Sequence, residues 1–138
     1  MNTINTNTFG LIIRQNIDNG MFCATDFVKQ TNVLRKKNGL SNFNLSQYIK
    51  SSSFIEFRNE LEISFDETVV ITQGSGGLTW LHPLLFVKVC LECYPVLIVQ
   101  NTHRLIDILS GYNNVIGTGF LTIINKIYSV YVVENLNI

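Results

Sequence analysis

The feature that most constrains the fold is the segment 69–83, which reads VVITQGSGGLTWLHP. A β-branched apolar run meets a cluster of glycines, and a second apolar run follows at once. Glycine adopts the positive φ angles that a tight chain reversal needs, so the pattern predicts a β-hairpin with strands at 69–72 and 78–81. Pro83 suits the first position of a helix, where its missing N–H costs nothing. The segment therefore predicts a strand, a Gly-rich tip, a second strand and a helix in succession.

Apolar periodicity and helix-stop signals predict the helices. A helix over 25–37, capped by its first residue, should stop at Asn38-Gly39, a pair that favours the αL conformation. Two short helices, or one kinked helix, are expected over 44–62. The nearly all-apolar segment 83–94 should form the buried central helix. A neighbouring helix is expected over about 95–110.

Further patterns complete the predicted topology. Asn44 with Gln47, and Ser53 with Glu56, have the spacing of capping boxes at the starts of the two short helices. A strand over 9–17 should return along 21–24 after an Asp-Asn-Gly turn, and residues 1–8 read as a flexible arm. Two more strands are expected within 111–138. The prediction is a small α+β domain with two hairpins, packed helices and C-terminal strands.

Composition bounds the class of protein. A chain of 138 residues that is 46% hydrophobic fits one domain with a real core. It contains no run of eighteen apolar residues, so we expect no membrane-spanning helix. No secretory signal pattern is visible at the start, and three cysteines without framework spacing suit a reducing cytoplasm.

Charge is segregated along the chain although the net charge is zero. Residues 27–55 carry five cations and no anion, whereas residues 56–67 carry five anions and one cation. Such a split produces a dipolar molecule with one basic face. The alternative is an ordinary solvated surface without a binding role.

The basic segment contains the first set of candidate site residues. Lysine and arginine grip phosphates without reading sequence, and asparagine pairs well with adenine edges. These residues are Lys29, Asn32, Arg35, Lys36, Lys37, Asn38 and Lys50. The alternative is that the cations only stabilise the C-terminal end of the helix through its dipole.

The Gly-rich tip supplies the second set, because it can act as a wing against a nucleic-acid groove. Its polar members are Gln73, Ser75 and Thr79, and the alternative is a plain turn. Trp80 should pack in the core, and His82 should cap the helix that begins at Pro83.

No catalytic or cofactor constellation is visible. The glycine segment fails the spacing of a nucleophile elbow, and neither a P-loop nor a dinucleotide fingerprint is present. Cys90 and Cys93 have the spacing of one half of a zinc site, but no second pair accompanies them. Small buried apolar side chains are the preferred interpretation of both cysteines. We therefore expect no enzyme activity, no metal and no cofactor.

Three blocks of the sequence resemble the KilA-N domain of bacteriophages and large DNA viruses. GSGGLTWLHP is similar to the family signature GGTW-x-HP, 19–27 to the DGY-x-NATKL block, and 54–61 to the FIEAL helix. The resemblance covers 9–110, flanked by the arm 1–8 and a C-terminal β extension over 111–138. Cys23 replaces the Asn of the second block, and the tip lacks the basic residue that the family often carries.

The resemblance implies a viral or prophage module that binds double-stranded DNA non-covalently in the host cytoplasm. The alternative is a protein-interaction module, such as a host-factor inhibitor or a virion component, that keeps the fold without binding DNA. An open edge on the C-terminal strands would offer a contact for a partner or for self-association. No membrane partner is expected.

Overall fold

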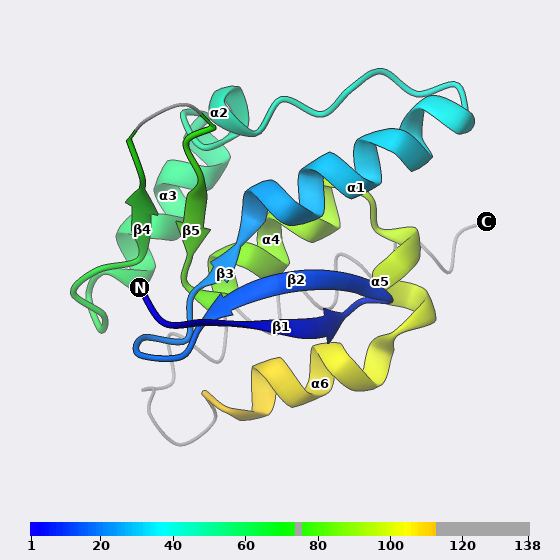
Figure 1. Ribbon diagram of the computed structural model, residues 1–138. Coiled ribbons are helices and arrows are strands. Elements are labelled where there is room, and N and C mark those ends of the chain that lie inside the picture. The colour runs from blue at the N-terminus through cyan, green and yellow to red at the C-terminus, as the bar shows by residue number, and fades with distance from the viewer. Residues whose placement is uncertain (74–75, 113–138) are drawn as a thin grey trace.

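A computed structural model describes residues 1–73 and 76–112 (Figure 1). These residues form one antiparallel five-stranded sheet and six helices, which confirms the predicted α+β class. The strands are β1 (Thr3–Thr8), β2 (Leu11–Asn16), β3 (Phe22–Cys23), β4 (Val69–Ile71) and β5 (Thr79–Leu81). The helices are α1 (Ala24–Lys37), α2 (Leu45–Tyr48), α3 (Ser52–Leu61), α4 (Pro83–Cys93), α5 (Val96–Gln100) and α6 (Thr102–Ser110). The order in the sheet is β1-β2-β3-β5-β4.

The N-terminal hairpin begins earlier than predicted. Residues 3–8 form β1 and pair with β2 along their whole length, so the predicted flexible arm is wrong. The turn is Phe9-Gly10, with φ angles of 54° and 79°, as a two-residue hairpin turn requires. Phenylalanine rarely occupies such a position, but the Phe9 side chain is buried and stacks on Phe86. The predicted return strand exists as the short β3, which pairs with β2.

The Gly-tipped hairpin has the predicted arrangement. β4 pairs with β5 in antiparallel register, with Val70 opposite Trp80. Beyond the strands, the Thr72 N–H donates to the Leu78 carbonyl at 2.9 Å, and the Leu78 N–H donates to the Thr72 hydroxyl at 2.8 Å. β5 also pairs with β3, so the two hairpins join into one sheet.

Helix boundaries follow the predictions with local shifts. α1 begins at Ala24 with Cys23 as its N-cap, because the Thr25 hydroxyl accepts the N–H of Thr79 instead of capping the helix. Gly39 has the positive φ expected of the helix stop. Asn44 caps α2 as predicted.

Two other boundaries differ from the predictions. α3 is capped by Ser51, whose hydroxyl accepts the Phe54 N–H, and not by Ser53. The single helix predicted over 95–110 is divided into α5 and α6 at Asn101, which has φ −135° and ψ 46°.

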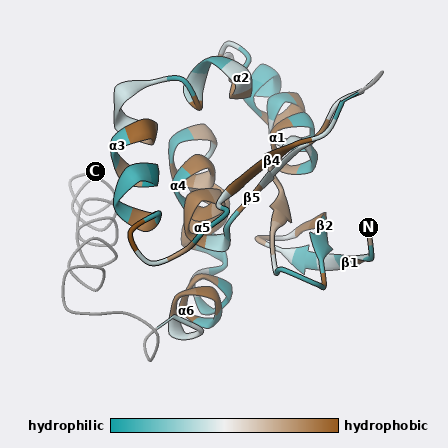
Figure 2. Ribbon diagram, turned by 90° about the vertical axis from the view of Figure 1, so that its left-hand side faces the viewer, coloured by the Kyte–Doolittle hydropathy of each residue, from teal (hydrophilic) through white to brown (hydrophobic). Residues whose placement is uncertain are grey.

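α4 is the buried central helix, as predicted. α1 and α3 pack against it from opposite sides, and α6 also contacts it (Figure 2). On its sheet side, Phe86 meets Phe9, Phe22 and Phe27, with ring centroids between 4.7 and 6.3 Å from its own. Among the described residues, no helix has the length and apolarity to cross a membrane. The C-terminal strands predicted beyond Tyr112 lie outside the described residues.

Candidate nucleic-acid interface

The exposed side of α1 carries three lysines. Lys29, Lys36 and Lys37 are all exposed, and none forms an ion pair with another residue of the described chain. Lys29 and Lys36 are seven residues apart, so they share one face of the helix at about 10 Å along its axis. Three of the predicted cations therefore lie together on one accessible surface.

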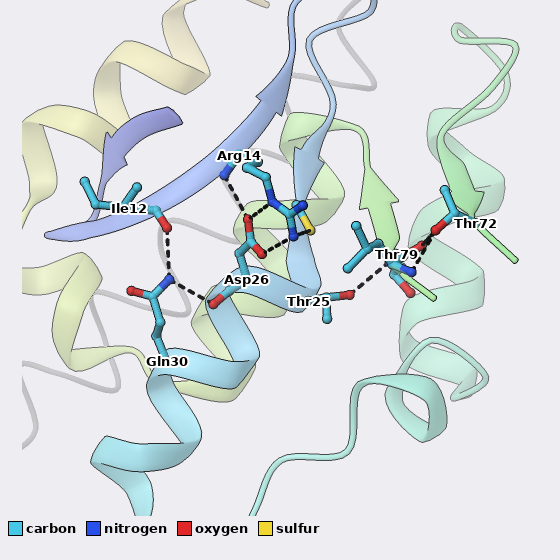
Figure 3. A network of polar contacts seen from close by, with 9 residues as sticks. Ile12, Arg14, Thr25, Asp26, Gln30, Thr72 and Thr79 are labelled. Atoms are coloured by element: carbon cyan, nitrogen blue, oxygen red, sulfur yellow. Dashed lines mark hydrogen bonds and ion pairs between the residues drawn. The ribbon is translucent and has the colours of Figure 1, made fainter. Parts of the chain in front are cut away.

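The acidic residue of α1 does not oppose these lysines, because its charge is neutralised. Asp26 accepts three hydrogen bonds from Arg14: from Nε at 2.8 Å, from Nη2 at 2.7 Å and from the backbone N–H at 3.0 Å (Figure 3). Burial raises the pKa of the Asp26 carboxyl, but the bonds from Arg14 outweigh it and hold the pKa below its ordinary value. Because Arg14 compensates the charge of Asp26, the net charge of this helix face comes from the three lysines.

Side-chain bonds fix α1 against the sheet and against the second hairpin. The Gln30 amide Nε2 donates to the Ile12 carbonyl of β2 at 2.9 Å. In the first turn of α1, the Thr25 hydroxyl accepts the Thr79 N–H of β5 at 2.9 Å. Figure 3 shows both contacts on either side of the Arg14–Asp26 pair. α1 and the base of the Gly-tipped hairpin therefore form one framework.

Arg14 and Gln30 were missed by the sequence reasoning. Arg14 was a lone charge inside a predicted strand, and its partner Asp26 is twelve residues away on another element. The guanidinium also lies 6.0 Å from the ring centroid of Trp80. A single charged residue in an otherwise uncharged strand is the available signal, but the sequence alone does not identify its partner.

Two asparagines predicted to contact bases instead form hydrogen bonds within the protein. The Asn32 amide donates to the Phe43 carbonyl at 3.2 Å and accepts the Phe43 N–H at 2.8 Å. The Asn38 amide donates to the Leu34 carbonyl and to the Tyr94 hydroxyl. Both side chains hold the segment that follows α1, which is a structural use of their amides.

Arg35 is also held by the fold. Its Nε donates to the Ser41 carbonyl at 2.7 Å, and its Nη1 donates to the Cys93 carbonyl at the end of α4 at 2.6 Å. This side chain links the loop after α1 to the C-terminal end of α4. Arg35 is half-buried, and both of these bonds engage its guanidinium within the fold.

The remaining candidates are spread over neighbouring elements. Lys50 is exposed just after α2, which packs beside α1. Gln73 is exposed at the edge of the hairpin tip, and Thr79 is half-buried at its base. Ser75 lies outside the described residues.

The acidic run is on the opposite side of the molecule. Figure 2 shows α3 and α1 on either side of the central α4. Glu56 and Glu60 lie on α3, and Glu62, Asp66 and Glu67 follow it; all five are exposed. The central α4 therefore separates the lysines of α1 from the glutamates of α3.

The residues interpreted as structural are buried. Cys90 and Cys93 are fully buried inside α4, and the Cys93 sulfur lies 3.2 Å from the Thr31 hydroxyl. No group of three potential metal ligands occurs within 1–73 and 76–112. The His82 Nδ1 accepts the Leu84 N–H at 3.2 Å, which confirms the predicted cap, and burial lowers the pKa of His82 to about 4.

Comparison with known proteins supports the resemblance. The family model of the KilA-N domain matches residues 4–110, which is most of the chain. No curated protein and no solved structure matched the chain. The match begins at the second residue of β1 and ends at the last residue of α6, so it covers every other helix and strand in full. The chain therefore belongs to the KilA-N domain family, whose members are generally DNA-binding domains of phage and viral proteins.

Proposed function

We propose that this chain is a DNA-binding module of a virus or prophage, which acts in the host cell by non-covalent contacts to duplex phosphates and grooves. The observation that carries the proposal is the group of three exposed lysines on α1, beside an aspartate neutralised by Arg14. Free ammonium groups on one face attract phosphate without reading sequence. No catalytic step is part of this proposal.

The position of the second hairpin also supports the proposal. The Thr25–Thr79 hydrogen bond links the start of α1 to β5. The helix and the hairpin are therefore held in a fixed relative position when a ligand binds. A rigid framework of this kind limits the ordering cost of binding. The acidic α3 faces away across α4, so it steers the duplex toward the α1 side.

Three predicted cations of α1 are exposed and have no ion-pair partner in the described chain, and this small number determines the expected affinity for DNA. Asn32, Arg35 and Asn38 are engaged within the fold. Three lysines that each displace a counterion give a slope of log K against log salt near −2.7, at about −0.9 per phosphate contact. We therefore expect modest, strongly salt-dependent affinity with little base readout from α1.

A salt titration of duplex binding by fluorescence anisotropy tests the proposal. Lys36→Ala with Lys37→Ala should flatten the slope by about 1.8. As a matched control, Asn59→Glu on α3 with Ser64→Glu just after it lowers the net charge by the same amount away from α1, and we expect the slope to stay unchanged. Equal effects of the two double variants would contradict the assignment of the interface to α1.

A protein-interaction module is the second candidate, and one observation favours it. Val33 lies between Lys29 and Lys36 on α1 with 56% of its surface exposed, and Leu40 is 49% exposed just beyond the helix. A mixed basic and apolar surface suits an acidic protein partner as well as DNA. If the parent chain binds no duplex at low salt, the DNA proposal fails and this second function gains support.

A further inference from the structure

Within residues 1–73 and 76–112, β1 is an edge strand that pairs with another strand on one side only. It pairs with β2 over all six of its residues, and β2 is the only element of the described chain that packs extensively against it. The other edge of the sheet, β4, has three residues. A short edge strand offers little to pair with, whereas a six-residue edge is a template for another strand.

The register identifies which backbone groups face outward. The Phe9-Gly10 turn makes Thr8 and Leu11 a hydrogen-bonded pair, and the Ile17 N–H donates to the Asn2 carbonyl at 3.0 Å. Since bonded and non-bonded pairs alternate in an antiparallel ladder, the even-numbered residues of β1 bond to β2. The N–H and C=O groups of Thr3, Asn5 and Asn7 therefore point away from the sheet.

β1 lacks the features with which proteins protect such an edge. Between residues 1 and 13 there is no charged side chain and no proline, and the first charged side chain is that of Arg14. Charged residues, prolines and bulges are the usual devices that prevent strand addition. The side chains of Thr3, Asn5 and Asn7 are all exposed, so no bulky or charged side chain of β1 itself keeps a second strand away.

We propose that β1 pairs with β1 of a second copy of the chain, in antiparallel register about Asn5, and joins the two sheets into one. This register uses all three outward-facing residues, because Asn5 lies opposite Asn5 of the second copy and Thr3 lies opposite Asn7. Each such pair exchanges two backbone hydrogen bonds. The interface is isologous and closes as a dimer.

The side chains of β1 suit this occupant. A two-fold axis places identical residues near one another, so a charged strand would repel its own copy; this strand has no charge to repel. The Asn5 carboxamide contains both a donor and an acceptor and can bond to its counterpart. Ile4, which is 48% exposed, would lie beside Thr6 of the second copy and lose apolar surface to it.

The position of the two-fold axis at Asn5 allows a charge-pairing test. Molar mass is measured by sedimentation equilibrium over a range of chain concentrations. We expect the parent to dimerise, and Asn5→Lys and Asn5→Asp each to raise the dimer dissociation constant by at least about fivefold through like-charge repulsion. An equal mixture of the two variants should dimerise again, because lysine then faces aspartate. Asn59→Lys on α3, which adds the same charge, should leave the mass unchanged.

Several results would overturn the proposal. A monomeric parent at high concentration would do so, as would an Asn5→Lys variant that dimerises as strongly as the parent. A mixture that stays monomeric while both variants keep the parent's circular dichroism spectrum would refute the register about Asn5. Slow amide exchange at Thr3, Asn5 and Asn7 in a monomer would show that another part of the same chain covers this edge.

Discussion

The burial of His82 makes stability depend on pH in a way that can be worked out in advance. His82 is 7% exposed, its Nδ1 accepts the Leu84 N–H, and its ring packs against both Phe65 and Tyr112 at centroid distances of 4.4 and 5.0 Å. Protonation would remove the acceptor and place a charge among aromatic rings. Burial therefore lowers the pKa of His82 to about 4 in the folded protein.

The sign and size of the effect follow from linkage. Above pH 6.5 the imidazole is neutral in both the folded and the unfolded chain. As the pH falls from 6.5 to about 4, the unfolded chain takes up a proton and the folded chain does not, so the free energy of unfolding falls. The interval between 6.5 and about 4 corresponds to a loss of about 3 kcal/mol, at about 1.4 kcal/mol per pH unit.

Urea denaturation at a series of pH values measures this loss. His82→Asn keeps a capping side chain but does not titrate, so we expect lower stability at pH 7 and a much flatter dependence between pH 6.5 and 4. His103→Asn is the matched control, because His103 is the other histidine of the chain and is exposed; its profile should follow the parent's. If the parent and His82→Asn lose the same free energy over this range, the reasoning is refuted.

Two further substitutions test the packing. Trp80→Ala should lower the free energy of unfolding by about 3–5 kcal/mol, because the ring is 2% exposed against Met21 and Cys23; a variant of parental stability that lost only DNA binding would contradict a structural role. Phe9→Asn should cost about 2–4 kcal/mol in urea denaturation, because the loss of a buried ring exceeds the relief of its left-handed backbone. A Phe9→Asn variant as stable as the parent would show that the strained turn, and not the ring, dominates.

The elements predicted well are those whose signals are local. The Gly-tipped hairpin, the apolar α4 and the stop at Gly39 depend on residue types at fixed spacing, and the structure has all three. β1 was missed because its turn carries Phe9 where a hairpin turn of this type normally has Asn or Asp. The Phe9 backbone conformation is stabilised by the burial of its ring against Phe86, seventy-seven positions further along the chain. Sequence periodicity reports only local patterns and cannot predict a contact between such distant residues.

The candidate site was predicted in part for the same reason. Exposed lysines on α1 follow from helix position alone, and Lys29, Lys36 and Lys37 are exposed as that position indicates. The roles of Asn32 and Arg35 depend on where the loop after α1 and the end of α4 come to lie. Tertiary hydrogen bonds convert these two side chains from free polar groups into structural ones, and no local pattern distinguishes the two outcomes.

The ring of Phe86 has a consequence for how the chain is made. During synthesis, β1, β2, β3 and α1 are all complete by Lys37, yet the ring that Phe9, Phe22 and Phe27 contact is added only at position 86. β3 can pair with its second neighbouring strand, β5, only after residues 79–81 have been synthesised. A nascent chain of seventy residues therefore exposes three aromatic side chains and one unpaired strand flank, the kind of surface that chaperones bind. The N-terminal half of the domain reaches its final packing only after the ribosome has delivered α4.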